Sequence, residues 1–182
     1  MIRQTVRVIS RTPQVRIVHL TAATFGALAD GDLAAAEQAS PVPLSPYFAG
    51  PDWAPVWPIR HAQVLADPAS AAWVTGVIWD DVRSVAAGRA GFHGPPDPAG
   101  MVEIGYAVVP ELRGQGYAAA ALTTLLDRSA REPGVRTVRL SIAPADDVSR
   151  RLALRHGFRE VGMQIDDEDG PEIVYERQPP VG

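Results

Sequence analysis

The sequence predicts an α+β fold, a mostly antiparallel sheet flanked by helices. Three apolar segments, at 72–79, 84–93 and 101–109, follow one another and are separated only by stretches rich in Asp, Gly and Pro. Such spacing is typical of antiparallel strands. The next segment, 117–131, carries apolar residues at helical spacing instead. Strands followed by helices are typical of the α+β class.

The first seventy residues predict smaller elements. Val6 to Leu20 alternates well enough for one or two strands, broken at Thr12-Pro13. Thr21 to Gln38 is rich in Ala and Leu and predicts a helix that begins after an N-cap at Thr21 and is interrupted near Gly31. A short helix is expected at 58–66.

Residues 40–58 hold six prolines, which exclude a continuous helix or a central strand. The same stretch holds Tyr47, Phe48, Trp53 and Trp57. Two interpretations stay open: the rings form a wall of an acceptor pocket, or they pack the loop onto the core.

The C-terminal part predicts a strand at 135–142, a helix at 146–156 and a hairpin at 158–178. The acidic run 166–169 predicts the solvated turn of that hairpin, although it could also help to attract a cationic amine.

Length and composition exclude several classes of protein. The 182 residues suit a single domain, 1–182. A net charge of −4 gives no basic footprint for nucleic acid, and no stretch has the length of a membrane span.

The chain has no cysteine, so disulfides, thiolate metal sites and a cysteine nucleophile are excluded, and a cytoplasmic location is expected. The four histidines show no metal-ligand spacing, and we expect no metal site.

The stretch from Arg113 to Ala118, Arg-Gly-Gln-Gly-Tyr-Ala, lies between an expected strand and an expected helix. The first turn of a helix has free N–H groups and the positive end of the helix dipole. Glycines let the backbone approach a ligand closely. The stretch therefore predicts a phosphate site made by the backbone from Gly114 to Ala119.

Three kinds of phosphate site compete. A nucleoside-triphosphate P-loop needs a lysine after its last glycine, and this chain contains no lysine. The letters 114–119 fit a dinucleotide fingerprint, but that motif closes its strand directly and opens its domain. Here four residues separate it from the strand, and about a hundred residues precede it.

The third kind is the acyl-coenzyme-A turn. Val108-Val109-Pro110 followed by Arg113-x-x-Gly116-x-Ala118 resembles the signature of the GNAT superfamily of N-acetyltransferases. The later Asp146-x-x-Ser149 and His156-Gly157-Phe158 are similar to the family's next helix, so the resemblance extends over 71–178. Glu103-Ile104-Gly105-Tyr106 is similar to the branch that contains ribosomal-protein and antibiotic acetyltransferases.

This resemblance implies a GNAT-like sheet with a parallel pair of central strands and acetyl-CoA as cosubstrate. The backbone of the strand that ends at Val108 would pair with the pantetheine arm, and the turn would hold the pyrophosphate. The expected cofactor-binding residues are Tyr106, Ala107, Val108, Arg113, Gly114, Gln115, Gly116, Tyr117, Ala118, Ala119, Asp146 and Ser149.

Glu103 is the candidate general base. It is the only charged residue in an apolar strand, and with a period of two it shares a face with Gly105 and Ala107, which leave space above it. It also matches a strand glutamate that serves as base in several family members. The competing interpretation is a structural pair with an arginine.

The chain departs from the family at the general acid. Ala153 stands where many members have the tyrosine that protonates the thiolate. The thiolate would then take its proton from water or from another side chain, or it would need no general acid. His156 is a further candidate, although a histidine near a helix end more often answers the helix dipole.

The leading hypothesis is an N-acetyltransferase that moves acetyl from acetyl-CoA to a primary amine by direct attack in a ternary complex. The acceptor would be an amine-bearing small molecule or the N-terminus of a protein or peptide, and a homodimer is compatible with the resemblance. The alternative is a non-catalytic acyl-CoA binding or sensing domain, which Ala153 alone supports.

Overall fold

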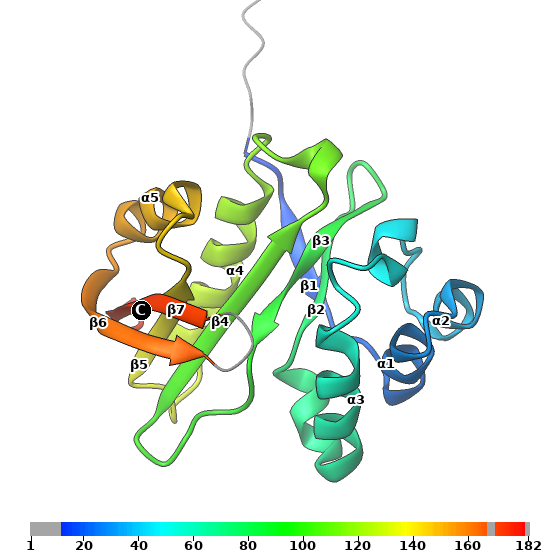
Figure 1. Cartoon of the computed structure of the whole chain (residues 1–182), viewed down its shortest axis with the longest axis horizontal. Helices are drawn as coiled ribbons and strands as arrows, with labels where there is room; N and C mark the ends of the chain where they lie inside the picture. The colour runs from blue at the N-terminus through cyan, green and yellow to red at the C-terminus, as the bar shows by residue number, and fades with distance from the viewer. Residues whose placement is uncertain (1–11, 167–169, 181–182) are drawn as a thin grey trace, which may run out of the picture.

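The computed structural model describes residues 12–166 and 170–180. Their strands form one seven-stranded sheet in the order β1-β2-β3-β4-β5-β7-β6 (Figure 1). The strands are β1 (Val15–Val18), β2 (Gly76–Asp80), β3 (Val85–Phe92), β4 (Met101–Val108), β5 (Thr137–Ile142), β6 (Arg159–Asp166) and β7 (Gly170–Arg177). Every neighbouring pair is antiparallel except β4 and β5, which are parallel. The predicted fold class is confirmed.

The helices cover both faces of the sheet. They are α1 (Ala22–Ala29), α2 (Leu33–Ala39), α3 (Val56–Ala66), α4 (Tyr117–Arg131) and α5 (Asp147–Arg155), with 3₁₀ turns η1 (Pro46–Ala49), η2 (Pro68–Ala72) and η3 (Pro110–Leu112). The expected N-cap at Thr21 is present, because its hydroxyl accepts a hydrogen bond from the Thr24 N–H at 3.1 Å. Helix α4 begins at Tyr117 and ends at Arg131, as predicted for the segment 117–131.

Two apolar cores lie on opposite faces of the sheet. One joins β4 and β5 to α4 and α5 and includes Leu122, Leu140 and Phe158. The other joins β2 to the segment that contains α1 and α3 and includes Phe25 and Trp57. Burial alternates along β5, as expected for a strand whose two faces differ.

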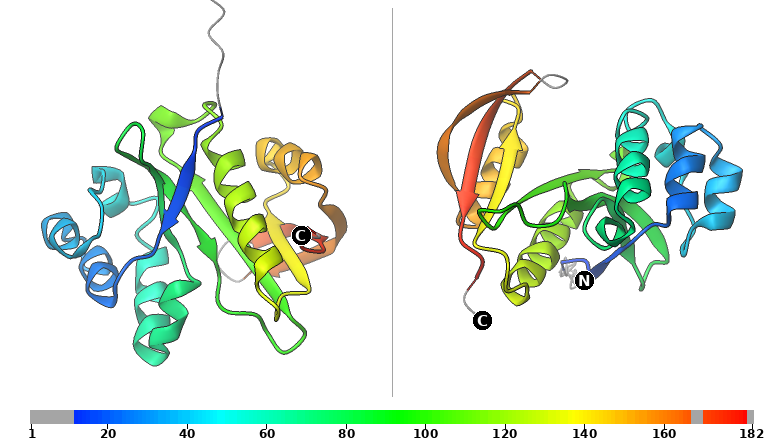
Figure 2. Two further views of the ribbon diagram at one scale, coloured as in Figure 1. Left: turned by 180° about the vertical axis from the view of Figure 1, so that it is seen from behind. Right: turned by 90° about the horizontal axis from the view of Figure 1, so that it is seen from below.

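The parallel pair separates after a short contact. Only Met101, Val102 and Glu103 of β4 pair with β5, opposite 137–139. Beyond Glu103 the two strands diverge, and the part of the sheet formed by β5, β6 and β7, here called the β5–β7 blade, lies at an angle to β1–β4 (Figure 2). Among the described residues, the C-terminal half of β4 therefore has one edge without a neighbouring strand.

Several boundaries differ from the prediction, and two of them have a clear local cause. The strand expected from 72 begins only at Gly76, because the Asp67 carboxylate accepts from the Ala69 N–H at 3.0 Å and starts the 3₁₀ turn η2. Helix α3 begins at Val56, two residues before Pro58. A proline is tolerated there because the first N–H groups of a helix have no partner within it.

Two other predictions fall partly outside the described residues, namely the start of the first strand before residue 12 and most of the acidic run at 166–169. Among the residues that the structure describes, no helix has the length and apolarity needed to cross a membrane.

Candidate active site

A cleft of about 610 Å³ fills the opening between β4 and β5. Its lining comes from both faces of the sheet, so the cleft passes through the sheet where the strands diverge. Toward α3 it is lined by Val56, Ile59, Arg60, Arg89, His93, Glu103 and Gly105, and toward α5 by Tyr106, Asp146 and Ser149. The β5–β7 blade contributes Leu140, Ser141, Ile142, Ala143, Gln164, Asp166 and Glu172. A cavity of this size can hold small ligands.

The predicted phosphate turn lies at the start of α4. Gly114 and Gly116 have φ angles of +74° and +90°, a conformation that other residues rarely adopt. Gly116 caps α4 without a side-chain hydrogen bond. No hydrogen bond within the described residues uses the N–H groups from Gly114 to Ala119. The turn thus presents free donors at the positive end of a helix.

Side chains beneath the turn hold it in place. The Arg113 Nε donates to the Val108 carbonyl at 3.1 Å. The Tyr117 ring is buried, and its hydroxyl donates to the Asp80 carboxylate at 2.8 Å. Arg83 donates to the same hydroxyl at 3.0 Å and to Gln115 at 3.1 Å. Tyr117 can therefore meet a ligand only through its backbone.

Hydrogen bonds with β3 decide which backbone groups of β4 face the open edge. The Glu103 carbonyl accepts from the His93 N–H at 2.8 Å, and the Val109 N–H donates to the Ala87 carbonyl at 3.0 Å. Because backbone groups alternate along a strand, the residues at 103, 105, 107 and 109 bond to β3. Tyr106 and Val108 direct their backbone groups to the open edge, whereas those of Ala107 face β3.

Asp146 and Ser149 line the cleft at the start of α5. The Asp146 carboxylate accepts from the Ser149 N–H at 2.9 Å and caps the helix. The Tyr106 hydroxyl reaches toward this helix start and is buried, with no hydrogen bond of normal length within the described residues. Burial raises the pKa of Tyr106, and Asp146 raises it further, while Ser149 lowers it. The phenol therefore keeps its proton at neutral pH.

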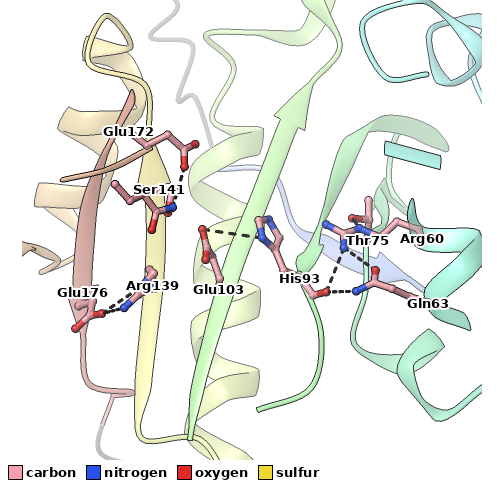
Figure 3. A network of polar contacts seen from close by, with 10 residues as sticks. Arg60, Gln63, Thr75, His93, Glu103, Arg139, Ser141, Glu172 and Glu176 are labelled. Atoms are coloured by element: carbon pink, nitrogen blue, oxygen red, sulfur yellow. Dashed lines mark hydrogen bonds and ion pairs between the residues drawn. The ribbon is translucent and has the colours of Figure 1, made fainter. Parts of the chain in front are cut away.

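Glu103 lies in the cleft with 17 % of its side chain exposed. Arg139 is its partner in the β4–β5 register, but that guanidinium bonds to Glu176 at 2.6 Å instead (Figure 3). Arg60 acts on Glu103 only as a nearby charge. Within the described residues, Glu103 thus has no hydrogen bond to an arginine. The competing interpretation, a structural pair with an arginine, required such a bond.

The ion-pair partner of Glu103 among the described residues is His93, a histidine whose sequence spacing gave no sign of a metal site. The two point toward one another, with 4.0 Å between Nδ1 and Oε1 (Figure 3). The His93 carbonyl accepts from Arg60 at 3.1 Å and from Gln63 at 2.8 Å, which fixes its backbone. Pairing the expected strands 84–93 and 101–109 as a hairpin would have placed it opposite Glu103.

The environment of His93 favours the neutral imidazole. Desolvation in the cleft is the main cause that lowers the pKa of His93 below the ordinary 6.5, and Arg60 and Arg89 lower it further. Glu103 and Asp166 act in the opposite direction. The net result is an imidazole that can accept a proton at neutral pH.

Three other candidates lie outside the cleft. Ala153 is fully buried in the first core and does not line the cleft. The His156 Nδ1 lies 2.9 Å from the Leu152 carbonyl at the end of α5, which explains this histidine as part of a helix end. None of the aromatic residues of 40–58 lines the cleft, and Phe48, Trp53 and Trp57 are buried in the second core. Packing is therefore the correct interpretation for these three rings.

The described residues contain no group of three or more His, Asp or Glu side chains arranged to hold a metal ion.

Comparison with known proteins assigns the domain. Residues 31–159, most of the chain, match the family described as "Acetyltransferase (GNAT) domain". No curated protein matches the chain.

Solved structures share this fold. A putative GnaT-family acetyltransferase from Bordetella pertussis is 24% identical, with a TM-score of 0.62 over 92% of this chain and 97% of that one. Ribosomal-protein-S5-alanine acetyltransferase from Vibrio fischeri is 15% identical, with a TM-score of 0.60 over 93% and 94%. A spermidine N-acetyltransferase chimera from Vibrio cholerae and hSSAT is 17% identical, with a TM-score of 0.60 over 93% and 96%. At these identities the likeness is one of fold.

Proposed function

Because the chain belongs to the GNAT acetyltransferase family and is therefore an acetyl-CoA-dependent N-acetyltransferase, we propose that it acetylates a primary amine by direct attack in a ternary complex. One observation carries this proposal: the cleft is lined from both faces of the sheet, by Arg60 and Glu103 on the α3 side and by Asp146 and Ser149 on the α5 side. The thioester and the amine can then enter from opposite faces and meet at β4. A chain without cysteine also offers no thiol for an acyl-enzyme.

The cosubstrate fits the chain at three points. The free N–H groups from Gly114 to Ala119 suit the pyrophosphate. The edge of β4 at Tyr106 and at the Val108 N–H suits the amide groups of the pantetheine arm, which can pair with it as a strand does, while the Val108 carbonyl already accepts from Arg113. The Tyr106 N–H on that edge suits the thioester carbonyl oxygen, on which negative charge develops.

Glu103 is the residue on which removal of the amine proton depends, either directly or through an intervening group. Its carboxylate lies on the α3 side of the cleft, the side from which the acceptor amine would enter. A base must lie within hydrogen-bond reach of the amine or one group away from it.

The Tyr106 hydroxyl is the group assigned to protonate the departing sulfur. It is buried beside the start of α5, on the side of the cleft opposite the amine. Its raised pKa means that the proton is present when the thiolate leaves. This assignment accounts for the lack of a tyrosine at position 153.

The acceptor is a primary amine of a small molecule or of a protein or peptide N-terminus. Two structural neighbours carry names that specify such acceptors, an alanine of ribosomal protein S5 and spermidine. The acidic side chains Glu103, Asp166 and Glu172 around the cleft favour the approach of a cationic amine.

The test is thiol release from acetyl-CoA with a panel of polyamines, amino acids and peptides with free N-termini, together with the mass of the product. The proposal predicts that at least one amine increases thiol release and gains one acetyl group. Initial rates should give intersecting lines when both substrates are varied. Parallel lines, or thiol release that no amine changes, would contradict direct attack on an amine.

A further inference from the structure

We propose that His93 is the immediate acceptor of the amine proton and that Glu103 is a positioning residue that acts through it. This inference rests on the proposed amine acetylation and specifies its proton path. Glu103 is on β4 and His93 directly follows β3, where its N–H donates to the Glu103 carbonyl at 2.8 Å, and both side chains lie on the α3 side of the sheet (Figure 3).

Access to the cleft differs between the two side chains. The His93 side chain is 49 % exposed, whereas that of Glu103 is 17 % exposed. Both line the cleft, so the imidazole is the more accessible base and the carboxylate lies deeper beside it.

The imidazole also lies next to the reacting part of β4. A Cβ on Gly105 would lie 2.9 Å from the His93 Nε2, so the ring occupies the space that this glycine leaves. Gly105 directly precedes Tyr106, whose N–H faces the open edge where the thioester carbonyl is expected. The Nε2 atom is thus beside the bond to be formed, while Nδ1 faces Glu103 at 4.0 Å.

The charges around His93 suit a group that is neutral at rest and positive after the step. Arg60 from α3 and Arg89 from β3 favour the neutral ring, as does desolvation. Glu103 from β4 and Asp166 from β6 stabilise the imidazolium once it forms. At 4.0 Å the carboxylate acts on the imidazole through its charge rather than through a hydrogen bond, and a nearby negative charge favours the protonated ring.

A cationic amine first releases one proton to solvent, because only the neutral nitrogen has a lone pair for the attack. The neutral nitrogen then forms a bond to the acetyl carbon, and a second proton moves from it to Nε2. The carbon–sulfur bond breaks, its electron pair stays on sulfur, and the thiolate takes a proton from the Tyr106 hydroxyl. The imidazolium then loses its proton to solvent, and the phenolate regains one, so the products are the amide and the free thiol.

The experiment is a pH–rate profile of kcat/KM for three proteins, the wild type, His93→Gln and Glu103→Gln, with an amine that gives turnover. Gln at position 93 keeps a polar side chain but cannot accept the proton. We expect His93→Gln to lower turnover by about 10²–10⁴-fold and to remove the inflection at low pH. His61→Gln, which removes a histidine outside the cleft, is the matched control and should keep the wild-type rate.

Glu103→Gln distinguishes the two bases. If His93 takes the proton, the wild-type rate falls as pH drops below 6.5, because the pKa of His93 is lowered. Removing the negative charge of Glu103 should move that inflection to still lower pH and reduce turnover by only about 10–100-fold. If Glu103 takes the proton itself, its variant loses the inflection, and His93→Gln keeps both turnover and inflection. That second pattern would overturn the inference.

A second measurement works without turnover. NMR titration of the His93 ring should give a pKa below 6.5 in the wild type and a lower value in Glu103→Gln. An unchanged His93 pKa in that variant would show that the two groups are not coupled and would overturn the inference, even if His93→Gln failed to fold. Absence of acetyl transfer to any amine in the wild type would instead refute the proposed function, and the inference with it.

Discussion

Gly116→Val tests the phosphate turn. Gly116 has a φ of +90°, and its Cβ would lie 3.2 Å from the Pro13 side chain. A β-branched residue at positive φ costs about 2 kcal/mol. For a chain of this length that cost lowers the melting temperature by about 4–8 °C. The fold should therefore survive, while the added side chain blocks the approach of the pyrophosphate.

The change in melting temperature that acetyl-CoA causes shows whether the variant still binds the cosubstrate. Acetyl-CoA at about a hundred times its dissociation constant stabilises the native state by about 2.7 kcal/mol. That stabilisation raises the melting temperature by about 5–11 °C. The wild type should show this rise by differential scanning fluorimetry, and Gly116→Val should show none.

Gly31→Val is the matched control. Gly31 has a φ of +72° in the turn between α1 and α2, and a Cβ there would meet no other atom within 4 Å. Gly31→Val introduces the same backbone strain at a position away from the cleft. The melting temperature of the free variant should therefore fall, but acetyl-CoA should raise that temperature as much as it does in the wild type. An equal rise in Gly116→Val and in Gly31→Val would refute the assignment of the turn.

Three further substitutions test the chemistry. Glu103→Gln should reduce turnover by about 10–100-fold and leave the affinity for acetyl-CoA unchanged. Glu37→Gln, at an exposed position, is the control and should keep the wild-type turnover. If Glu103→Gln lost stability but kept its turnover, the role of Glu103 would be structural. Tyr106→Phe removes the assigned general acid and should slow turnover by about 10²–10⁴-fold. Its melting temperature should stay the same or rise, because the substitution removes a buried hydroxyl without a hydrogen-bond partner of normal length. Full activity would remove the phenol from the mechanism. Ala153→Tyr should cost about 1–3 kcal/mol by overpacking with no gain in turnover; a large gain would show that the native chain lacks an effective acid.

The sequence predicted best where local signals decide the structure. The glycine turn and both ends of α4 follow from apolar periodicity and from Gly116 at the N-cap. The alternation that exposes Glu103 follows from the period of a strand. These features depend on neighbours within one or two turns of chain.

The sequence could not predict features that depend on tertiary packing. The cleft exists because β5 leaves β4 after Glu103, and nothing local to either strand specifies that divergence. The role of Trp57 was open for the same reason, since only the packing of α1 and α3 shows that its ring is buried. His93 was missed because its significance comes from the residue across the hairpin rather than from its neighbours in sequence.

The open edge of β4 is the part of the account on which every other assignment depends. A crystal structure of the wild type with acetyl-CoA tests it most directly. We expect the pyrophosphate on the N–H groups from Gly114 to Ala119, the thioester carbonyl at the Tyr106 N–H, and the acetyl carbon facing the part of the cleft that His93 and Glu103 line. A complex whose pantetheine arm lies outside the opening between β4 and β5, or whose acetyl group is on the side away from His93, would contradict it.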